Sequence, residues 1–203
     1  MTITSIRQQI KRIDRFSVYV DGKYSFSLGE AALLISKINS GQDINEQRIR
    51  ELKQLADGDK FYNQASRYVI LRPHTKWEID RYLQRKQASP TLINEILNKL
   101  SNIGLIDDAQ YARSYIHDRK LLRPTSRRKI RYELRKKYIS DKIIEEVMSD
   151  GIDNEQSTIR LIIERKRQQS RYQDDLKLMQ YLARQGFHYG DIKEALKDIG
   201  SKP

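Results

Sequence analysis

The stretch that decides the fold is residues 112–148, which read ARSYIHDRKLLRPTSRRKIRYELRKKYISDKIIEEVM. Apolar side chains recur in it at helical spacing, in three groups separated by polar segments: Ala112, Tyr115 and Ile116; Ile130 and Leu134; Ile144, Val147 and Met148. Steps of three and four residues place each group on one face of a helix. The stretch therefore predicts three short amphipathic helices.

The same pattern occurs once before and once after this stretch. The first apolar positions of the three copies are residues 65, 112 and 159, so successive copies begin 47 residues apart. Each copy has an anchoring leucine in its second group, at Leu83, Leu134 and Leu182. An isoleucine follows each anchor ten residues later, at Ile93, Ile144 and Ile192. A repeat of this length indicates tandem helical units, each of which gains stability by packing on its neighbour.

Residues that favour helix starts lie where this repeat needs them. Ser89-Pro90, Ser140-Asp141 and Gly190-Asp191 precede the third helix of their units. Ser126 and Asp107-Asp108 stand before other predicted helices. Side-chain oxygens at these positions accept hydrogen bonds from the free N–H groups of a first helical turn, and proline supplies a suitable φ.

The first 28 residues have a different pattern, that of strands. Phe16, Val18 and Val20 alternate with polar residues, as do Tyr24, Phe26 and Leu28, and Asp21-Gly22 lies between the two runs. An Asp-Gly pair between two such runs predicts a β-hairpin with a type I′ turn. Residues 2–10 are interpreted as a third strand. A helix follows, ending at Gly41, with these side chains on its inner face: Ala31, Leu34, Ile35 and Ile38.

These patterns predict a mostly α-helical fold of tandem three-helix, helix-turn-helix-like repeats in an elongated array, with a small N-terminal module that contains a β-hairpin. A further helix is expected over residues 45–56, completing that module. We predict four domains: the N-terminal module at 1–58, and three-helix repeats at 59–106, 107–153 and 154–203.

Composition narrows the class of function. The 203 residues include no cysteine and carry 39 Lys+Arg against 27 Asp+Glu, a formal net charge of +12. The longest apolar run, residues 31–35, is far shorter than the ~20 residues that cross a bilayer. No secretory signal pattern follows Met1. We therefore expect a cytoplasmic protein without a membrane partner, attracted to a polyanion such as nucleic acid or an acidic protein surface.

No motif predicts catalysis, a cofactor or a metal. The chain contains neither a phosphate-binding P-loop motif nor a dinucleotide-binding glycine motif. His74, His117 and His188 are far apart, and none has a second histidine three or four residues away. We expect exposed or interfacial histidines rather than metal ligands. The carboxylates of Asp107-Asp108 and Asp174-Asp175 are interpreted as helix caps.

The strongest candidate for a binding surface is a basic segment in the second repeat. Residues 119–137 hold ten basic side chains and one acid, Glu133. The candidate nucleic-acid or partner-binding residues are Arg119, Lys120, Arg123, Arg127, Arg128, Lys129, Arg131, Arg135, Lys136 and Lys137. On a helix over residues 127–137, Arg127, Arg131 and Arg135 form a stripe. A helix with such like-charge neighbours and no nearby acid favours an anionic partner.

Most of the twelve tyrosines fall at positions expected in helix cores. Trp77 and Tyr132, which lie beside basic residues, are the two aromatic side chains that we would test for stacking on nucleic-acid bases.

These residues resemble the RecX family, regulators of the RecA recombinase. The most specific segment is Gly104-Leu105-Ile106-Asp107-Asp108, followed by Tyr111-Ala112, Tyr115-Ile116 and Arg119. Residues 72–79, 130–139, 184–187 and 20–24 support the resemblance, which covers about residues 13–200. The chain departs from the family at Tyr138, where the family usually has glycine, and at Pro124-Thr125, where it often has one.

The resemblance implies three tandem three-helix units, no enzymatic activity, and binding in the groove of the filament that RecA forms on single-stranded DNA. It implies modulation, chiefly inhibition, of the ATPase, strand-exchange and co-protease functions of the recombinase, in homologous recombination, DNA repair and the SOS response. We also expect non-specific binding to duplex DNA. Since a tandem array needs no second copy to fold, we expect a monomer.

A helix-turn-helix-like regulator that acts directly on DNA or RNA is the alternative. Three-helix units resemble helix-turn-helix modules, whose second or third helix enters a groove of DNA. The basic segment lacks the Asn and Gln mixture that reads base edges, and one chain supplies no two-fold pair of recognition helices.

Overall fold

The computed structural model describes residues 1–149 and 155–200. It begins with a three-stranded antiparallel sheet in the order β1-β2-β3, formed by β1 (Ile3–Gln8), β2 (Arg15–Val20) and β3 (Lys23–Gly29). Asp21 and Gly22 join β2 to β3 with positive φ angles of 48° and 80°, as a type I′ turn requires. The predicted hairpin and the third strand are both confirmed.

The helix after the sheet does not present the predicted face. In α1 (Glu30–Ser36), Ala32 and Ser36 are buried, whereas Leu34 and Ile35 are 73% and 71% exposed. The helix ends early because Lys37 adopts a left-handed conformation, with φ of 51°. Ala31 is exposed as well, so the inner face that the sequence predicted for this helix is wrong at Ala31, Leu34 and Ile35.

One long helix replaces two that the sequence suggested. α2 (Glu46–Leu71) starts at Asn45, whose side chain accepts the N–H of Arg48, and continues for 26 residues. Its first half completes the core of the N-terminal sheet, with Ile49 and Leu52 buried against β-strand residues. Its second half, from Phe61, belongs to a second hydrophobic core. The predicted domain boundary at 58/59 falls inside this helix.

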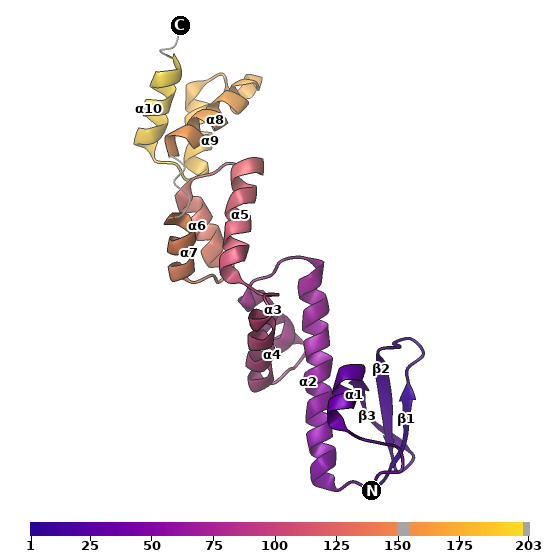
Figure 1. Ribbon diagram of the computed structural model, residues 1–203. Helices are drawn as coiled ribbons and strands as arrows, with labels where there is room; N and C mark the ends of the chain where they lie inside the picture. Colours follow the sequence, from indigo (N-terminus) through magenta and orange to yellow (C-terminus); the bar gives the residue numbers. More distant parts are fainter. Residues whose placement is uncertain (150–154, 201–203) are drawn as a thin grey trace. The chain divides into compact units, whose positions relative to one another are not determined.

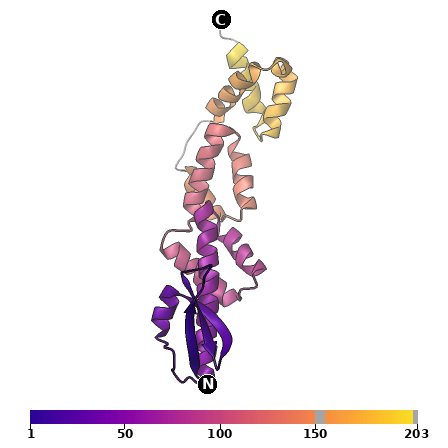
Figure 2. The ribbon, with the colours of Figure 1, turned by 90° about the vertical axis from the view of Figure 1, so that its right-hand side faces the viewer.

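A buried ion pair holds the sheet to α2. Arg15 on β2 is 6% exposed, and its guanidinium lies 3.2 Å from the Asp59 carboxylate of α2. Asp59 also accepts the N–H of Gly29 at 2.9 Å, and Arg15 donates to the Ser27 carbonyl at 2.9 Å. Every strong polar group in this contact is therefore paired. In two views α2 runs along the sheet with α1 beside it (Figures 1 and 2).

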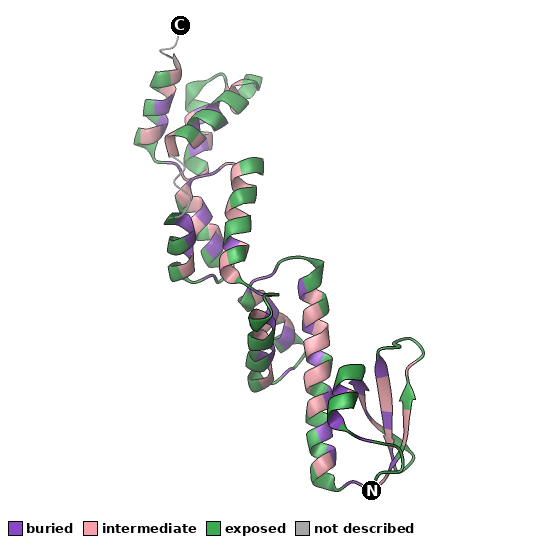
Figure 3. Cartoon of the chain, in the orientation of Figure 1, coloured by how far each residue is buried: buried purple, intermediate pink, exposed green. Residues whose placement is uncertain are grey.

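The three predicted helical repeats appear as three helix groups. The first contains the second half of α2, α3 (Lys76–Arg85) and α4 (Pro90–Asn102), and the second contains α5 (Asp108–Leu122), α6 (Arg127–Lys136) and α7 (Asp141–Ser149). The third contains α8 (Glu155–Arg167), a 3-10 helix at Ser170–Tyr172, α9 (Asp175–Arg184) and α10 (Tyr189–Gly200). Each group has its own hydrophobic core. Along these helices buried residues, purple in Figure 3, alternate with exposed ones.

The anchors and caps of the repeat hold the expected places. Leu83, Leu134 and Leu182 are fully buried. Ser89, Asp107, Ser126 and Asp174 each accept backbone N–H groups in the first turn of the following helix. α10 begins at Tyr189, slightly before the predicted Gly190-Asp191. The fold is thus mostly helical with a small N-terminal sheet, as the sequence predicted.

By its internal contacts the chain divides into two compact bodies. The N-terminal body comprises Met1–Pro73 and Ile79–Ile106, and the C-terminal body comprises His74–Glu78 and Asp107–Pro203. The second and third three-helix units therefore share one body. The finer division into four domains stays a prediction. Within the described ranges, no helix combines the length and the hydropathy that a bilayer crossing needs.

The turn between α9 and α10 packs closely on the start of α6. The Gln185 carbonyl accepts the Ser126 N–H at 3.3 Å and the Thr125 hydroxyl at 3.0 Å. Gly186 has φ of 91°, and a Cβ placed on it would lie 2.4 Å from Ser126 Oγ. Only glycine fits this contact, for reasons of both conformation and space.

Candidate nucleic-acid or partner interface

Arg119, the first residue of the basic segment, is neutralised within the protein. Its guanidinium lies 3.0 Å from the Glu133 carboxylate and donates to the Tyr115 hydroxyl at 2.8 Å. The Tyr115 hydroxyl in turn donates to Glu133 at 2.8 Å. Burial raises the pKa of Tyr115, which therefore stays a neutral donor in this triad. The single acid of the segment thus pairs α5 with α6.

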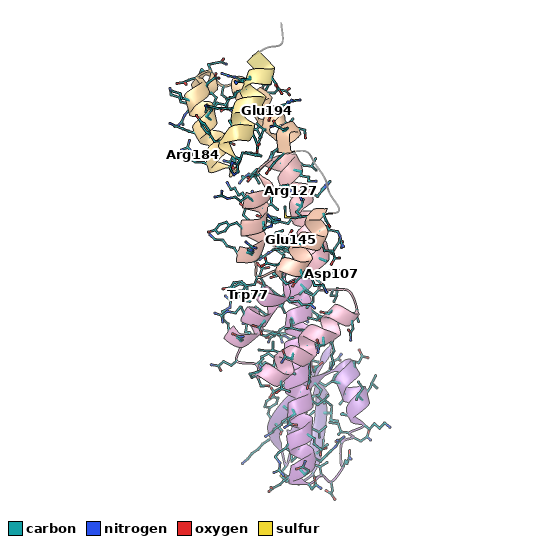
Figure 4. The ribbon with its side chains drawn as sticks, turned by 90° about the vertical axis from the view of Figure 1, so that its left-hand side faces the viewer. Trp77, Asp107, Arg127, Glu145, Arg184 and Glu194 are labelled. Atoms are coloured by element: carbon teal, nitrogen blue, oxygen red, sulfur yellow. The ribbon has the colours of Figure 1, made fainter. Side chains whose placement is uncertain are left out.

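The predicted arginine stripe on α6 faces acids that the linear sequence hides. Arg131 makes a two-pronged ion pair with Glu145 of α7, at 2.9 and 3.1 Å. Arg135 contacts Asp141 at 2.7 Å, and this hydrogen bond raises the pKa of Arg135. The expectation that no acid lies near the stripe is therefore wrong. Figure 4 labels Glu145 on the helix that supplies these carboxylates.

Arg127 and Lys137, near the two ends of α6, are also engaged. The Arg127 guanidinium donates to the Met148 carbonyl at 2.8 Å, and its backbone N–H donates to the Glu155 carboxylate at 2.9 Å. Lys137 Nζ lies 2.7 Å from the carboxylate of Glu78, whose side chain is 13% exposed. These cations brace neighbouring elements of the C-terminal body.

Arg123, Arg128 and Lys136 are exposed and have no carboxylate partner among the residues that the structure describes. Arg123 ends α5, and Lys136 Nζ lies 4.7 Å from the ring centre of Tyr132. Lys120 is half-buried and lines a cavity of about 350 Å³ beside Pro124 and Ile130. The ten predicted residues therefore divide into internally paired and outward-facing cations.

A second concavity gathers cations from both three-helix units of the C-terminal body. It has a volume of about 490 Å³, and its cationic lining residues, which we call the basic pocket, are Arg119, Arg123, Lys129, Arg165 and Lys166. The rest of its lining is uncharged. Lys129 Nζ donates to the Gln185 side chain at 2.9 Å, and Lys166 Nζ lies 4.7 Å from the ring centre of Tyr181.

Sequence reasoning missed Arg165 and Lys166. Both lie in the last turn of α8, outside the basic segment of residues 119–137. The charge surplus of residues 111–171, with 17 basic and 9 acidic side chains, extends to them. Only the packing of the third unit on the second brings them into one cavity with Arg123.

Of the two aromatic candidates, Tyr132 lies within α6 and Trp77 lies in the first turn of α3. Trp77 stacks on Tyr138 with ring centres 4.1 Å apart and planes 8° from parallel, and Tyr132 is 57% exposed. Tyr138 has φ of 58°, the left-handed conformation that glycine adopts most readily. A glycine at this position, which the resemblance noted above implies, would therefore suit the backbone found here. In this chain the stack of Tyr138 on Trp77 offsets the strain of the larger residue.

We expect Tyr138→Gly to unfold at a higher denaturant concentration than Tyr138→Ala. Both variants lose the stack, worth about 0.5–1.5 kcal/mol, but alanine retains a left-handed strain of roughly 1–2 kcal/mol. Urea unfolding of the full chain, followed by circular dichroism, measures the difference. Equal stability of the two variants would show that Tyr138 is not strained.

Acidic and histidine side chains form no cluster suited to a metal over residues 1–149 and 155–200. In the described part of the chain, no group of three or more His, Asp or Glu side chains is arranged to hold an ion. His117 and His188 are exposed, as expected, whereas His74 is only 4% exposed. Burial raises the pKa of Asp108, whose carboxylate accepts the Lys76 N–H at 2.9 Å. Asp107 and Asp108 thus both act at helix starts.

Comparisons with known proteins point to one family. Residues 107–148 match the family model described as RecX, second three-helix domain, and residues 1–45 match that of the Regulatory protein RecX N-terminal domain. A Regulatory protein RecX from Clostridium acetobutylicum is 30% identical over 99% of this chain and 97% of its own length. The Bacillus subtilis protein of that name is 25% identical, over 97% of this chain and 76% of its own.

Relatives from Lactobacillus delbrueckii, also named Regulatory protein RecX, are 31% and 30% identical over 75% of this chain. The match spans 56% of their length. A crystal structure of regulatory protein RecX superposes with a TM-score of 0.74 and 27% identity, over 97% of this chain and 98% of that one. The crystal structure of RecX from Lactobacillus salivarius gives 0.63 and 26%, over 71% and 97%.

Proposed function

Because the chain belongs to the RecX family of regulatory proteins, we propose that it regulates a RecA-type recombinase by binding the filament of that recombinase on single-stranded DNA. The proposed action is inhibition of filament-dependent ATP hydrolysis, strand exchange and co-protease activity, without catalysis by the chain itself. The proposed partners are the recombinase and DNA, in the cytoplasm, with the chain acting as a monomer.

The observation that carries this proposal is the set of outward-facing cations. Arg123, Arg128, Lys136 and Arg165 are all exposed and lack carboxylate partners among the described residues. A filament on DNA offers phosphates and acidic protein surface along a groove. Several weak contacts along such a repeating partner raise the overall affinity without one tight site.

The internal ion pairs refine which of the ten basic residues make the contact. Arg131 and Arg135 are held by Glu145 and Asp141, so their charges are largely balanced before any partner binds. Cations that face outward without an acidic partner can attract an anion without first giving up an internal ion pair. We therefore place the main electrostatic contact at Arg123, Arg128 and Lys136, with the remaining seven residues in support.

The test is ATP hydrolysis by the host recombinase on single-stranded DNA, with this protein added at substoichiometric amounts. We expect inhibition at well below one molecule per recombinase protomer. Raising the salt from 50 to 200 mM should weaken the inhibition by about 10-fold or more, because contacts to phosphates release counterions. The double variant Arg128→Glu/Lys136→Glu should require a several-fold higher concentration for the same inhibition.

A matched control has the same charge change elsewhere in the C-terminal body. Lys142 and Lys177 are exposed and line none of the cavities described above. Lys142→Glu/Lys177→Glu should inhibit like the unchanged protein. Loss of inhibition in both variants would indicate a dependence on net charge alone. Absence of inhibition at any ratio, with sequence-specific duplex binding, would replace the proposal by the helix-turn-helix alternative.

A further inference from the structure

We propose that the basic pocket holds a backbone phosphate of bound single-stranded DNA between the second and third three-helix units. This inference deepens the proposed function and rests on it. The pocket is formed by the end of α5, the loop that follows it, the first turn of α6, the last turn of α8, and α9. Its residues thus come from elements on both sides of one contact within the C-terminal body.

The charge of the pocket is not balanced by its own lining. Of its five cations, Arg119 pairs with a carboxylate, that of Glu133. Lys129 contacts a neutral amide and Lys166 lies over aromatic rings, so these contacts do not balance the charge of either lysine. Arg123 and Arg165 are exposed without an acidic partner in the described part of the chain. Four unneutralised cations around one cavity attract an anion strongly.

The arrangement favours phosphate over the carboxylates of an acidic protein. The cations line the cavity from three helices, with Arg119 and Arg123 at the end of α5, Lys129 on α6, and Arg165 and Lys166 on α8. A planar carboxylate presents two oxygens in one plane, which suit a single guanidinium. A backbone phosphate presents oxygens in a tetrahedral arrangement and can accept from arginines and lysines on opposite walls.

The walls are held in place before any ligand binds. The Gln185 carbonyl accepts hydrogen bonds from Thr125 and Ser126, which fixes α9 against the loop before α6. Lys129 is oriented by the Gln185 side chain, and Lys166 by Tyr172 and Tyr181, at 5.2 and 4.7 Å from their ring centres. Such preorganisation lowers the entropic cost of binding.

The experiment measures the affinity of the full chain for a fluorescently labelled oligothymidylate of thirty nucleotides. Fluorescence anisotropy is recorded at salt concentrations from 50 to 200 mM. Arg123→Gln/Arg165→Gln should bind about 10-fold more weakly at 50 mM. The slope of log affinity against log salt should fall in magnitude by about 0.7, since the pocket holds one phosphate and each lost phosphate contact on a single strand removes about that much. Circular dichroism and thermal unfolding check that this double variant and the control variant described next are folded.

The matched control is Lys142→Gln/Lys177→Gln, which removes the same charge outside the pocket. Its slope should equal that of the unchanged protein. Equal slopes for the two double variants would overturn the proposal. So would unchanged oligonucleotide binding by Arg123→Gln/Arg165→Gln combined with lost filament binding, because the pocket would then contact the recombinase.

A third arm separates a strand phosphate from a free one. Inorganic phosphate, pyrophosphate or ATP at 1 mM should displace little oligonucleotide beyond the effect of equal ionic strength. Displacement specific to one of these anions, lost in Arg123→Gln/Arg165→Gln, would assign the pocket to a free anion instead. These assays contain no recombinase, so the pocket can bind DNA even if inhibition of the filament fails.

Discussion

Asp59→Ala is expected to destabilise the N-terminal body by about 3–5 kcal/mol, the largest effect of any substitution considered. The side chains of Arg15 and Asp59 are 7% and 12% exposed, so the variant leaves a guanidinium buried without its counter-charge. The Gly29 N–H loses its acceptor as well. Urea unfolding of the full chain and hydrogen exchange of the β2 and β3 amides measure the loss.

A double variant separates the ion pair from packing. In Arg15→Met/Asp59→Leu both charges are replaced by apolar groups, which is often neutral or stabilising when the volume is kept. We expect this variant to regain much of the stability lost in Asp59→Ala. If Asp59→Ala alone costs less than about 1 kcal/mol, water reaches Arg15 and the pair does not hold the sheet to α2.

Gly186→Ala is expected to cost at least about 2 kcal/mol in the C-terminal body. Alanine at φ of 91° is strained, and its Cβ would lie 2.4 Å from Ser126 Oγ at the start of α6. The α9–α10 turn must then move away from Thr125 and Ser126, which widens the basic pocket. We expect weaker oligonucleotide binding together with the loss of stability.

Gly104→Ala is the matched control for this prediction. Gly104 also has a positive φ, of 73°, but a Cβ there meets nothing within 4 Å. Its alanine variant should lose roughly 1 kcal/mol from strain alone and should bind oligonucleotide normally. Equal losses in the two variants would mean that the contact between Gly186 and Ser126 adjusts without cost.

Elements that depend on local chemistry were predictable. The turn at Asp21-Gly22, the caps at Ser126 and Asp107, and the buried anchor Leu134 follow from side chains within a few residues of each other. The inner face of α1 was predicted wrongly because Ala32 and Ser36, two small residues, allow close packing on the sheet. An apolar pattern favours Leu34 and Ile35 instead, but these two side chains are exposed.

The candidate site was predictable only in composition. The density of charge between Arg119 and Lys137 is visible in the sequence, but its neutralisation is not. Glu145 and Asp141 reach α6 only after α7 folds back on it, and Arg165 faces Arg123 only after the third unit packs on the second. Long-range pairing of this kind leaves no periodic signal in the chain.

The continuity of α2 determines how the N-terminal module can be removed. A truncation at residue 58, the boundary that the repeat suggests, would begin the first three-helix unit in the middle of a helix. Its first turn would lose the carbonyl acceptors of residues 55–58. Asp59, the residue left to cap that turn, would lose its partners Arg15 and Gly29. A truncation before Asn45 keeps the cap on Arg48 but exposes Ile49 and Leu52 to water. Cooperative unfolding should therefore couple the sheet to the first three-helix unit, and neither is a freely exchangeable part.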